Sequence, residues 1–221
     1  PGGDWLHRAR VVHERTRRLA TRRLDASLYY LIYSAGHSVE RYASHHALLA
    51  MAVCEHACSL LGWEEPLRDS IGRAALTMNV AMVRLQDLLA QSDLNPSAEM
   101  RVEIDAHAAR GAALLRASGV DDAVWRDAVR YHHDNSDAEL PLEQLPPGRQ
   151  VARLLRRVDI FTAKLSRRKT RVPMSPVQAA KEACLGASGT PDEIGAALLK
   201  AVGLYPPGSF VELASGELGV V

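Results

Sequence analysis

The recurrence of apolar residues at helical spacing constrains this chain more than any other feature of its sequence. Up to about residue 200, apolar side chains return at i, i+3 or i+4, and i+7. One such stripe consists of Ala43, Ala47, Ala50, Cys54, Ala57 and Leu61. Similar stripes run over 71–89, 100–114 and 151–165. Because one apolar face per helix is typical of amphipathic helices that pack on one another, the sequence predicts a helical bundle.

Capping and helix-breaking residues divide the pattern. Further helices are expected over 4–24, 121–133, 175–185 and 191–201. Asp69 and Ser97 are expected to cap helix N-termini. The stretch 135–148 is rich in proline and acidic residues and predicts a loop.

A change of pattern marks the C-terminal end. After Pro206-Pro207-Gly208, apolar segments at 210–213 and 217–221 flank a short turn, which predicts a small β-hairpin. The predicted fold class is all-α with this hairpin attached. Three parts are expected: a basic helix or linker over 1–25, a helical domain over 26–202, and a hairpin extension over 203–221.

Composition excludes several functions. The 221 residues are 47% hydrophobic and 24% charged, with a net charge of +1, so we expect no affinity for nucleic-acid polymers. No apolar run reaches the roughly 18 residues that a membrane span needs. Three cysteines without zinc-like spacing favour reduced thiols and a cytoplasmic location. Seven arginines against one acid between residues 8 and 23 predict a solvated basic helix or, alternatively, a phosphate- or lipid-binding one.

Five residues are candidates for chemistry: His37, His107, His132, His133 and Asp159. Most of them fall on or beside the apolar stripes of different helices. A buried imidazole or carboxylate is costly unless it is paired or holds a metal, so these side chains are expected to converge in the bundle interior. The alternatives are hydrogen-bonded core histidines, a polar His-His helix end, and an ion pair of Asp159 with a nearby basic residue, Arg156 or Lys164.

Several segments, in order, resemble the HD-GYP branch of the HD phosphohydrolases, from about residue 30 to the C-terminus. They are Tyr33-Ser-Ala-Gly-His37-Ser38, Asp105-Ala-His107, Tyr131-His132-His133-Asp134, Arg157-Val158-Asp159-Ile160-Phe161, Ser166-Arg-Arg-Lys-Thr-Arg171 and Leu204-Tyr-Pro-Pro-Gly-Ser209. The resemblance implies an HD-domain-like helical bundle. It also implies a role in bacterial signalling through cyclic di-GMP and a metal-dependent phosphodiesterase site.

Three departures from the family pattern fall on the residues that the resemblance makes essential. Where the family reads Leu-Leu-His-Asp-Ile-Gly-Lys, this chain has Met78 for the His, Asn79 for the Asp and Met82 for the Lys. The Gly-Tyr-Pro loop is reduced to Pro141 within 136–141. Tyr33 stands where some members carry a glutamate ligand.

These departures change the expected chemistry. In the family, the aspartate of the His-Asp pair bridges two metals that activate water. Asn79 is neutral with one carbonyl oxygen, and the thioether of Met78 suits only soft metals. We therefore expect no binuclear centre and no intact catalytic set. A single divalent ion (Zn, Ni, Fe or Mn) on His37, His107, His132, His133 and Asp159 remains the alternative.

Three functions follow from this pattern. The leading hypothesis is a catalytically impaired signalling domain that binds a cyclic dinucleotide or a protein partner. The second is a phosphohydrolase with a mononuclear site, and the third is a dimerising helical scaffold. The candidates for phosphate binding are Arg167, Arg168, Lys169 and Arg171, because guanidinium forks match phosphate oxygens, although a solvated helix end would look the same.

Overall fold

The computed structural model describes residues 4–185 and 189–221 and confirms the all-α class with a small hairpin. Its elements in chain order are α1 (Trp5–Arg22), α2 (Leu24–His37), α3 (Tyr42–Leu60), α4 (Glu65–Thr77), α5 (Val83–Gln91), α6 (Ala98–Ala117), α7 (Ala123–Tyr131), the 3-10 helix η1 (Leu142–Gln144), α8 (Pro147–Leu165), α9 (Pro176–Cys184), α10 (Glu193–Val202), β1 (Phe210–Glu212) and β2 (Leu218–Val220).

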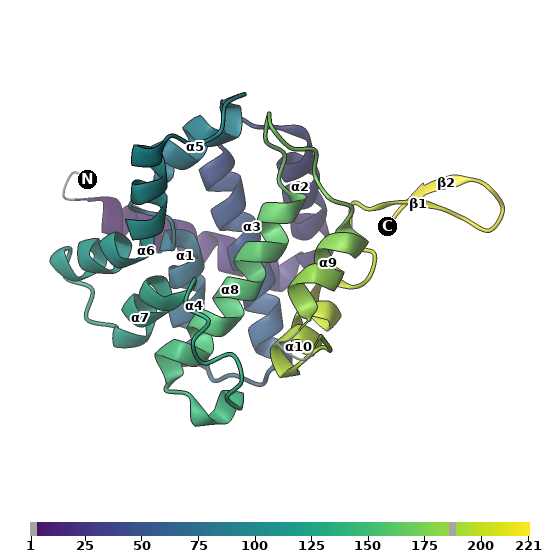
Figure 1. Cartoon of the computed structure of the whole chain (residues 1–221). Coiled ribbons are helices and arrows are strands. Elements are labelled where there is room, and N and C mark those ends of the chain that lie inside the picture. The colour runs from purple at the N-terminus through teal and green to yellow at the C-terminus, as the bar shows by residue number, and fades with distance from the viewer. Residues whose placement is uncertain (1–3, 186–188) are drawn as a thin grey trace.

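Helix α3 forms the centre of the bundle. Its residues 49–54 are fully buried, and α1, α2, α4, α5, α8 and α10 all pack against it. Helix α8 lies on one side of α3, between α7 and the pair α9 and α10 (Figure 1). No helix in the described ranges is both long and apolar enough to cross a membrane.

Several predicted boundaries hold and others do not. The helices expected over 121–133, 175–185 and 191–201 are α7, α9 and α10, and the hydroxyl of Ser97 caps α6. The capping role predicted for Asp69 is wrong, because α4 begins four residues earlier, with Pro66 in its first turn. The stripe over 71–89 is interrupted, since residues 78–82 form turns between α4 and α5.

The basic N-terminal segment is a helix that packs on the bundle. Arg17 of α1 contacts Glu55 at 3.3 Å, Glu65 at 2.5 Å and Asp69 at 3.0 Å, and Arg68 also contacts Glu55, at 2.5 Å. We call these residues, with Arg73 bound to Asp69, the α1 ion-pair cluster. The basic helix expected over 4–24 is therefore α1, and it is attached to α3 and α4.

A glycine lets α1 approach α4 closely. His13 of α1 is 3% exposed, and a Cβ placed on Gly72 of α4 would lie 2.5 Å from its Nε2. Any other residue at position 72 would push against this ring. The close contact between α1 and α4 therefore requires a residue without a side chain at position 72.

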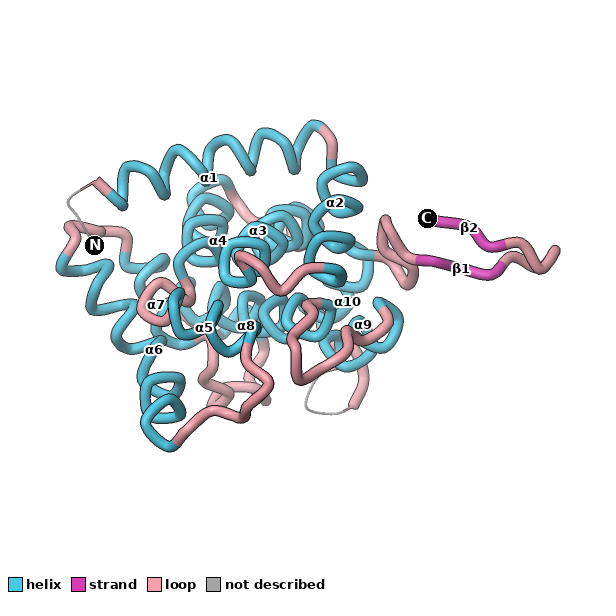
Figure 2. The backbone as a smooth tube through the Cα atoms, turned by 90° about the horizontal axis from the view of Figure 1, so that it is seen from above, coloured by secondary structure: helices cyan, strands magenta, loops and turns pink. Residues whose placement is uncertain are grey.

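The hairpin projects away from the helices (Figure 2). Its strands β1 and β2 pair antiparallel, with Phe210 opposite Val220 and Glu212 opposite Leu218. The C-terminal residue is tied back to the bundle end, since the Gly208 N–H donates to the Val221 carbonyl at 2.8 Å.

Candidate metal centre

Three histidine side chains from α6 and the end of α7 meet inside the bundle. His107 lies in the middle of α6, His132 caps the C-terminus of α7, and His133 follows it. One donor nitrogen of each ring lies within 4.8 Å of the other two. We call these residues the three-histidine cluster. Three of the five side chains expected to converge therefore do so.

Local sequence fixes the helices that carry these rings. The carboxylate of Asp122 accepts the Trp125 N–H at 2.9 Å and so caps α7. The indole N–H of Trp125 then donates to the Thr77 hydroxyl at 2.8 Å, which holds α7 against the end of α4. Gly111 lies one turn after His107 and lets α6 approach α7, because a Cβ there would be 3.2 Å from Val129.

The hydrogen bonds of the two buried rings determine which nitrogens are free. The Nδ1 atoms of His107 and His132 lie 2.5 Å from the Ile104 carbonyl and 2.7 Å from the Val129 carbonyl. A carbonyl can only accept, so each Nδ1 carries the proton and each neutral ring has its lone pair on Nε2. These two Nε2 atoms face each other at 3.3 Å. Two buried lone pairs that face each other repel unless a shared proton or a cation lies between them.

Electrostatics favour the neutral form of His132 and of His133. Burial, with the neighbouring His133, lowers the pKa of His132 to about 3, against the smaller raising effect of the Asp159 charge. Burial also lowers the pKa of His133, which is the exposed member of the cluster. Neutral imidazole is the form that binds metal. The arrangement can therefore hold one divalent ion of the borderline class, such as zinc, cobalt or nickel.

Asp159 lies on α8 beside the cluster but is engaged elsewhere. Its Oδ1 is 2.8 Å from Nε2 of His46, a residue of α3 that is 1% exposed. The alternative ion pair with Arg156 or Lys164 is not found among the described residues. Asp159 is outside the group of donors that lie within 4.8 Å of one another, although its charge acts on His132 and His133.

His46 is the site residue that the sequence reasoning missed. A signal for it was present, because it lies three residues after Ala43 and four before Ala50 and so belongs to the same apolar stripe. His45 beside it, also a histidine, is only half-buried.

His37 does not join the cluster. It ends α2 as an exposed side chain, stacks on Tyr33 with ring centres 4.1 Å apart, and its Nδ1 lies 2.8 Å from the Tyr33 carbonyl. The four-residue spacing along one helix accounts for both contacts.

The three substituted positions lie in the turn region after α4. Met78 is 1% exposed and belongs to the core, while Asn79 is 9% exposed. Asn79 lines a cavity of about 330 Å³ bounded by α1, α3, α4 and α5 and by none of the three histidines. Met82 is half-buried at the start of α5.

The basic segment after α8 is partly tied to the bundle. Arg168 donates to the Tyr42 hydroxyl at 3.0 Å and lies over the Tyr42 ring at 4.9 Å. Lys169 contacts Asp93 at 3.3 Å, Arg171 donates to the Ala163 carbonyl, and Arg167 is exposed. These four candidates for phosphate binding therefore do not form one cradle; Arg167, Lys169 and Arg171 are exposed, and Arg168 is half-buried.

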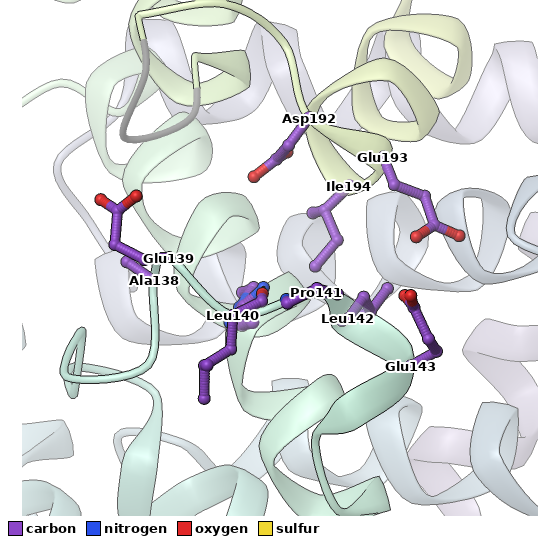
Figure 3. Close-up of a pocket in the computed structure, with 10 residues that line it drawn as sticks. Ala138, Glu139, Leu140, Pro141, Leu142, Glu143, Asp192, Glu193 and Ile194 are labelled. Atoms are coloured by element: carbon purple, nitrogen blue, oxygen red, sulfur yellow. The ribbon is translucent and has the colours of Figure 1, made fainter.

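The segment between α7 and α8 borders a second cavity. Residues 138–143 and the start of α10 enclose about 300 Å³, with Ile194 pointing toward Pro141 (Figure 3). Arg149 secures this segment by contacts to Asp134 at 2.8 Å and Asp137 at 2.7 Å. None of the three histidines lines this cavity.

Comparisons with known proteins name no family for this arrangement: no protein-family model matches the chain, and no curated protein and no solved structure is significantly similar to it.

Proposed function

We propose that this chain is an HD-GYP-type signalling domain that has lost the two-metal centre, holds a single divalent ion, and acts by binding rather than by efficient hydrolysis. One observation carries the proposal: the facing Nε2 lone pairs of His107 and His132, with His133 beside them. Such a set of neutral nitrogen donors fits one borderline metal ion.

The substituted turn supports the loss of the second metal. A bridging ligand must be anionic, and Asn79 offers only one neutral oxygen. Met78 is packed in the core, so the wall that would face a second ion is apolar. The proposed ligand is a cyclic dinucleotide whose phosphates meet the accessible Arg167 and Lys169; a protein partner is the alternative.

Metal analysis and calorimetry test this function. Purified protein should contain about one zinc or nickel per chain, as expected for a three-ligand site. Removing the cluster with His107→Ala and His132→Ala should abolish the metal. Titration with cyclic di-GMP should release heat that Arg167→Ala with Lys169→Ala removes. Absence of heat with every dinucleotide tried would exclude the nucleotide and leave a protein partner.

A slow phosphohydrolase is the second candidate, favoured by the exposure of His133 on one side of the cluster. A bound divalent ion supplies Lewis acidity and makes a coordinated water more acidic. Turnover of a chromogenic phosphodiester, lost on His133→Ala and unchanged on His37→Ala, would establish this activity. A rate equal to that of buffer with metal alone would reject it.

A further inference from the structure

We propose that His46 holds the carboxylate of Asp159 away from the three-histidine cluster, and so makes the site a three-nitrogen centre selective for borderline metals. This inference rests on the proposed single-metal function. It assigns His46 as a positioning residue that determines which metals the site accepts.

The contacts of His46 show how the carboxylate is held. Its Nε2 lies 2.8 Å from Oδ1 of Asp159, and its Nδ1 lies 3.4 Å from the hydroxyl of Thr162. That hydroxyl gives its proton to the Val158 carbonyl at 2.9 Å, so its oxygen is free to accept. Both ring nitrogens therefore have a partner, and the ring is held between Asp159 and Thr162.

The charge of Asp159 agrees with this pairing. Burial raises the pKa of its carboxyl, but the hydrogen bond and charge of His46, with His132 and His133, outweigh burial and hold the pKa below its usual range. A carboxylate that is 16% exposed needs hydrogen-bond partners, and the His46 imidazole of α3 supplies one.

The surroundings prevent His46 from turning away. The ring is 1% exposed and stacks nearly parallel on Tyr42, with centres 5.8 Å apart and planes inclined by 9°. Arg168 covers Tyr42 in turn, with two nitrogens at 3.0 and 3.2 Å from its hydroxyl. Arg168 holds Tyr42 and Tyr42 holds the His46 ring, so the His46–Asp159 contact is preorganised.

This pairing has a consequence for metal choice. Hard ions such as manganese prefer carboxylate oxygens, whereas imidazoles alone favour zinc, cobalt and nickel. With Asp159 engaged by His46, the cluster offers nitrogen donors only. Releasing Asp159 should add an oxygen donor beside the cluster.

Metal titrations of the full chain test the inference. His46→Leu should raise the affinity for Mn²⁺, followed by electron paramagnetic resonance, at least about tenfold, because the carboxylate becomes free to bind a hard ion. The double variant His46→Leu with Asp159→Asn should lose this gain. His56→Leu, a half-buried histidine on the same helix, is the matched control and should leave Mn²⁺ binding unchanged. A folded His46→Leu variant without the gain overturns the inference.

A second variant covers the case in which His46→Leu does not fold. Asp159→Asn alone keeps an acceptor for His46 and should leave the visible absorption spectrum of bound Co²⁺ unchanged, because Asp159 is not a ligand. A Co²⁺ spectrum altered by this substitution would make Asp159 a ligand and overturn the inference. If the unaltered chain binds no Zn²⁺, Co²⁺ or Ni²⁺, the proposed single-metal function fails, and this result is distinct from either outcome above.

Discussion

Two polar clusters, each with buried members, lie in different parts of this bundle, and the kinds of side chain in them differ in a way that separates structure from function. In the α1 ion-pair cluster, three arginines meet three acids, and the contacts range from 2.5 to 3.9 Å. In the three-histidine cluster, two nitrogen lone pairs face each other and the nearby carboxylate is bound to His46. The first cluster pairs opposite charges with one another, whereas the surplus acceptors of the second are suited to a cation.

The largest difference between the two clusters should appear in the free energy of unfolding when metal is added. At a free Zn²⁺ concentration of 100 times the dissociation constant, binding should raise the free energy of unfolding by about 2.7 kcal/mol. Thermal melts should show this gain for the unaltered chain and for Arg17→Ala but not for His132→Ala. An equal response in all three proteins would mean that zinc binds elsewhere.

The next effect concerns stability without metal. Arg17→Ala leaves Glu55, which is 4% exposed, with Arg68 as its remaining partner. Because the Arg17 side chain is 21% exposed, we expect a loss of about 2 kcal/mol, below the roughly 3–5 kcal/mol of a fully buried pair. Urea unfolding measures it. The exposed Arg18 on the same helix is the control, and Arg18→Ala should change stability by less than about 0.5 kcal/mol.

A smaller effect is expected where α1 meets α4. Gly72→Ala should lower the free energy of unfolding by about 1–2 kcal/mol, because the new Cβ overlaps the ring of His13. His13→Ala in the same chain should recover most of this loss. No recovery would show that the glycine matters for another reason, and Zn²⁺ binding should be unchanged in both variants.

The smallest effect is the contribution of His13 to acid sensitivity. Burial lowers its pKa, opposed by Asp69 and Glu55 and assisted by Arg73 and Arg17. Its stabilising contribution is complete above the unfolded value of about 6.5 and falls as the pH drops below it, because the unfolded chain takes up the proton first. His13→Gln should flatten this part of the stability curve, by less than about 1.4 kcal/mol per pH unit. An unchanged slope would contradict the prediction.

The helices were predictable where the spacing of apolar residues agrees with the positions of capping and helix-breaking residues. Ser97 with the stripe behind it predicts α6, and the proline- and glycine-rich end predicts the hairpin. The break at 78–82 was not predictable from period, because Met78 and Met82 continue the apolar spacing through a segment that is not helical. Burial alone does not distinguish a core turn from a core helix.

The candidate site was predictable only in part. Inward spacing identified His107 and His132, and the doublet identified His133. The partner of Asp159 could not be found locally, since His46 is 113 residues away and reaches it only through the packing of α3 on α8. His37 shares the residue type but ends α2 in an exposed position.

The exposure of one ring in three has a kinetic consequence. His107 and His132 are closed off from solvent, so an ion exchanging with a chelator must pass the side of His133. The buried pair then sets how tightly the ion is retained, and the outer ring sets how fast it comes and goes. A bulky neighbour of His133 should slow loading and release together, and leave the equilibrium occupancy nearly unchanged.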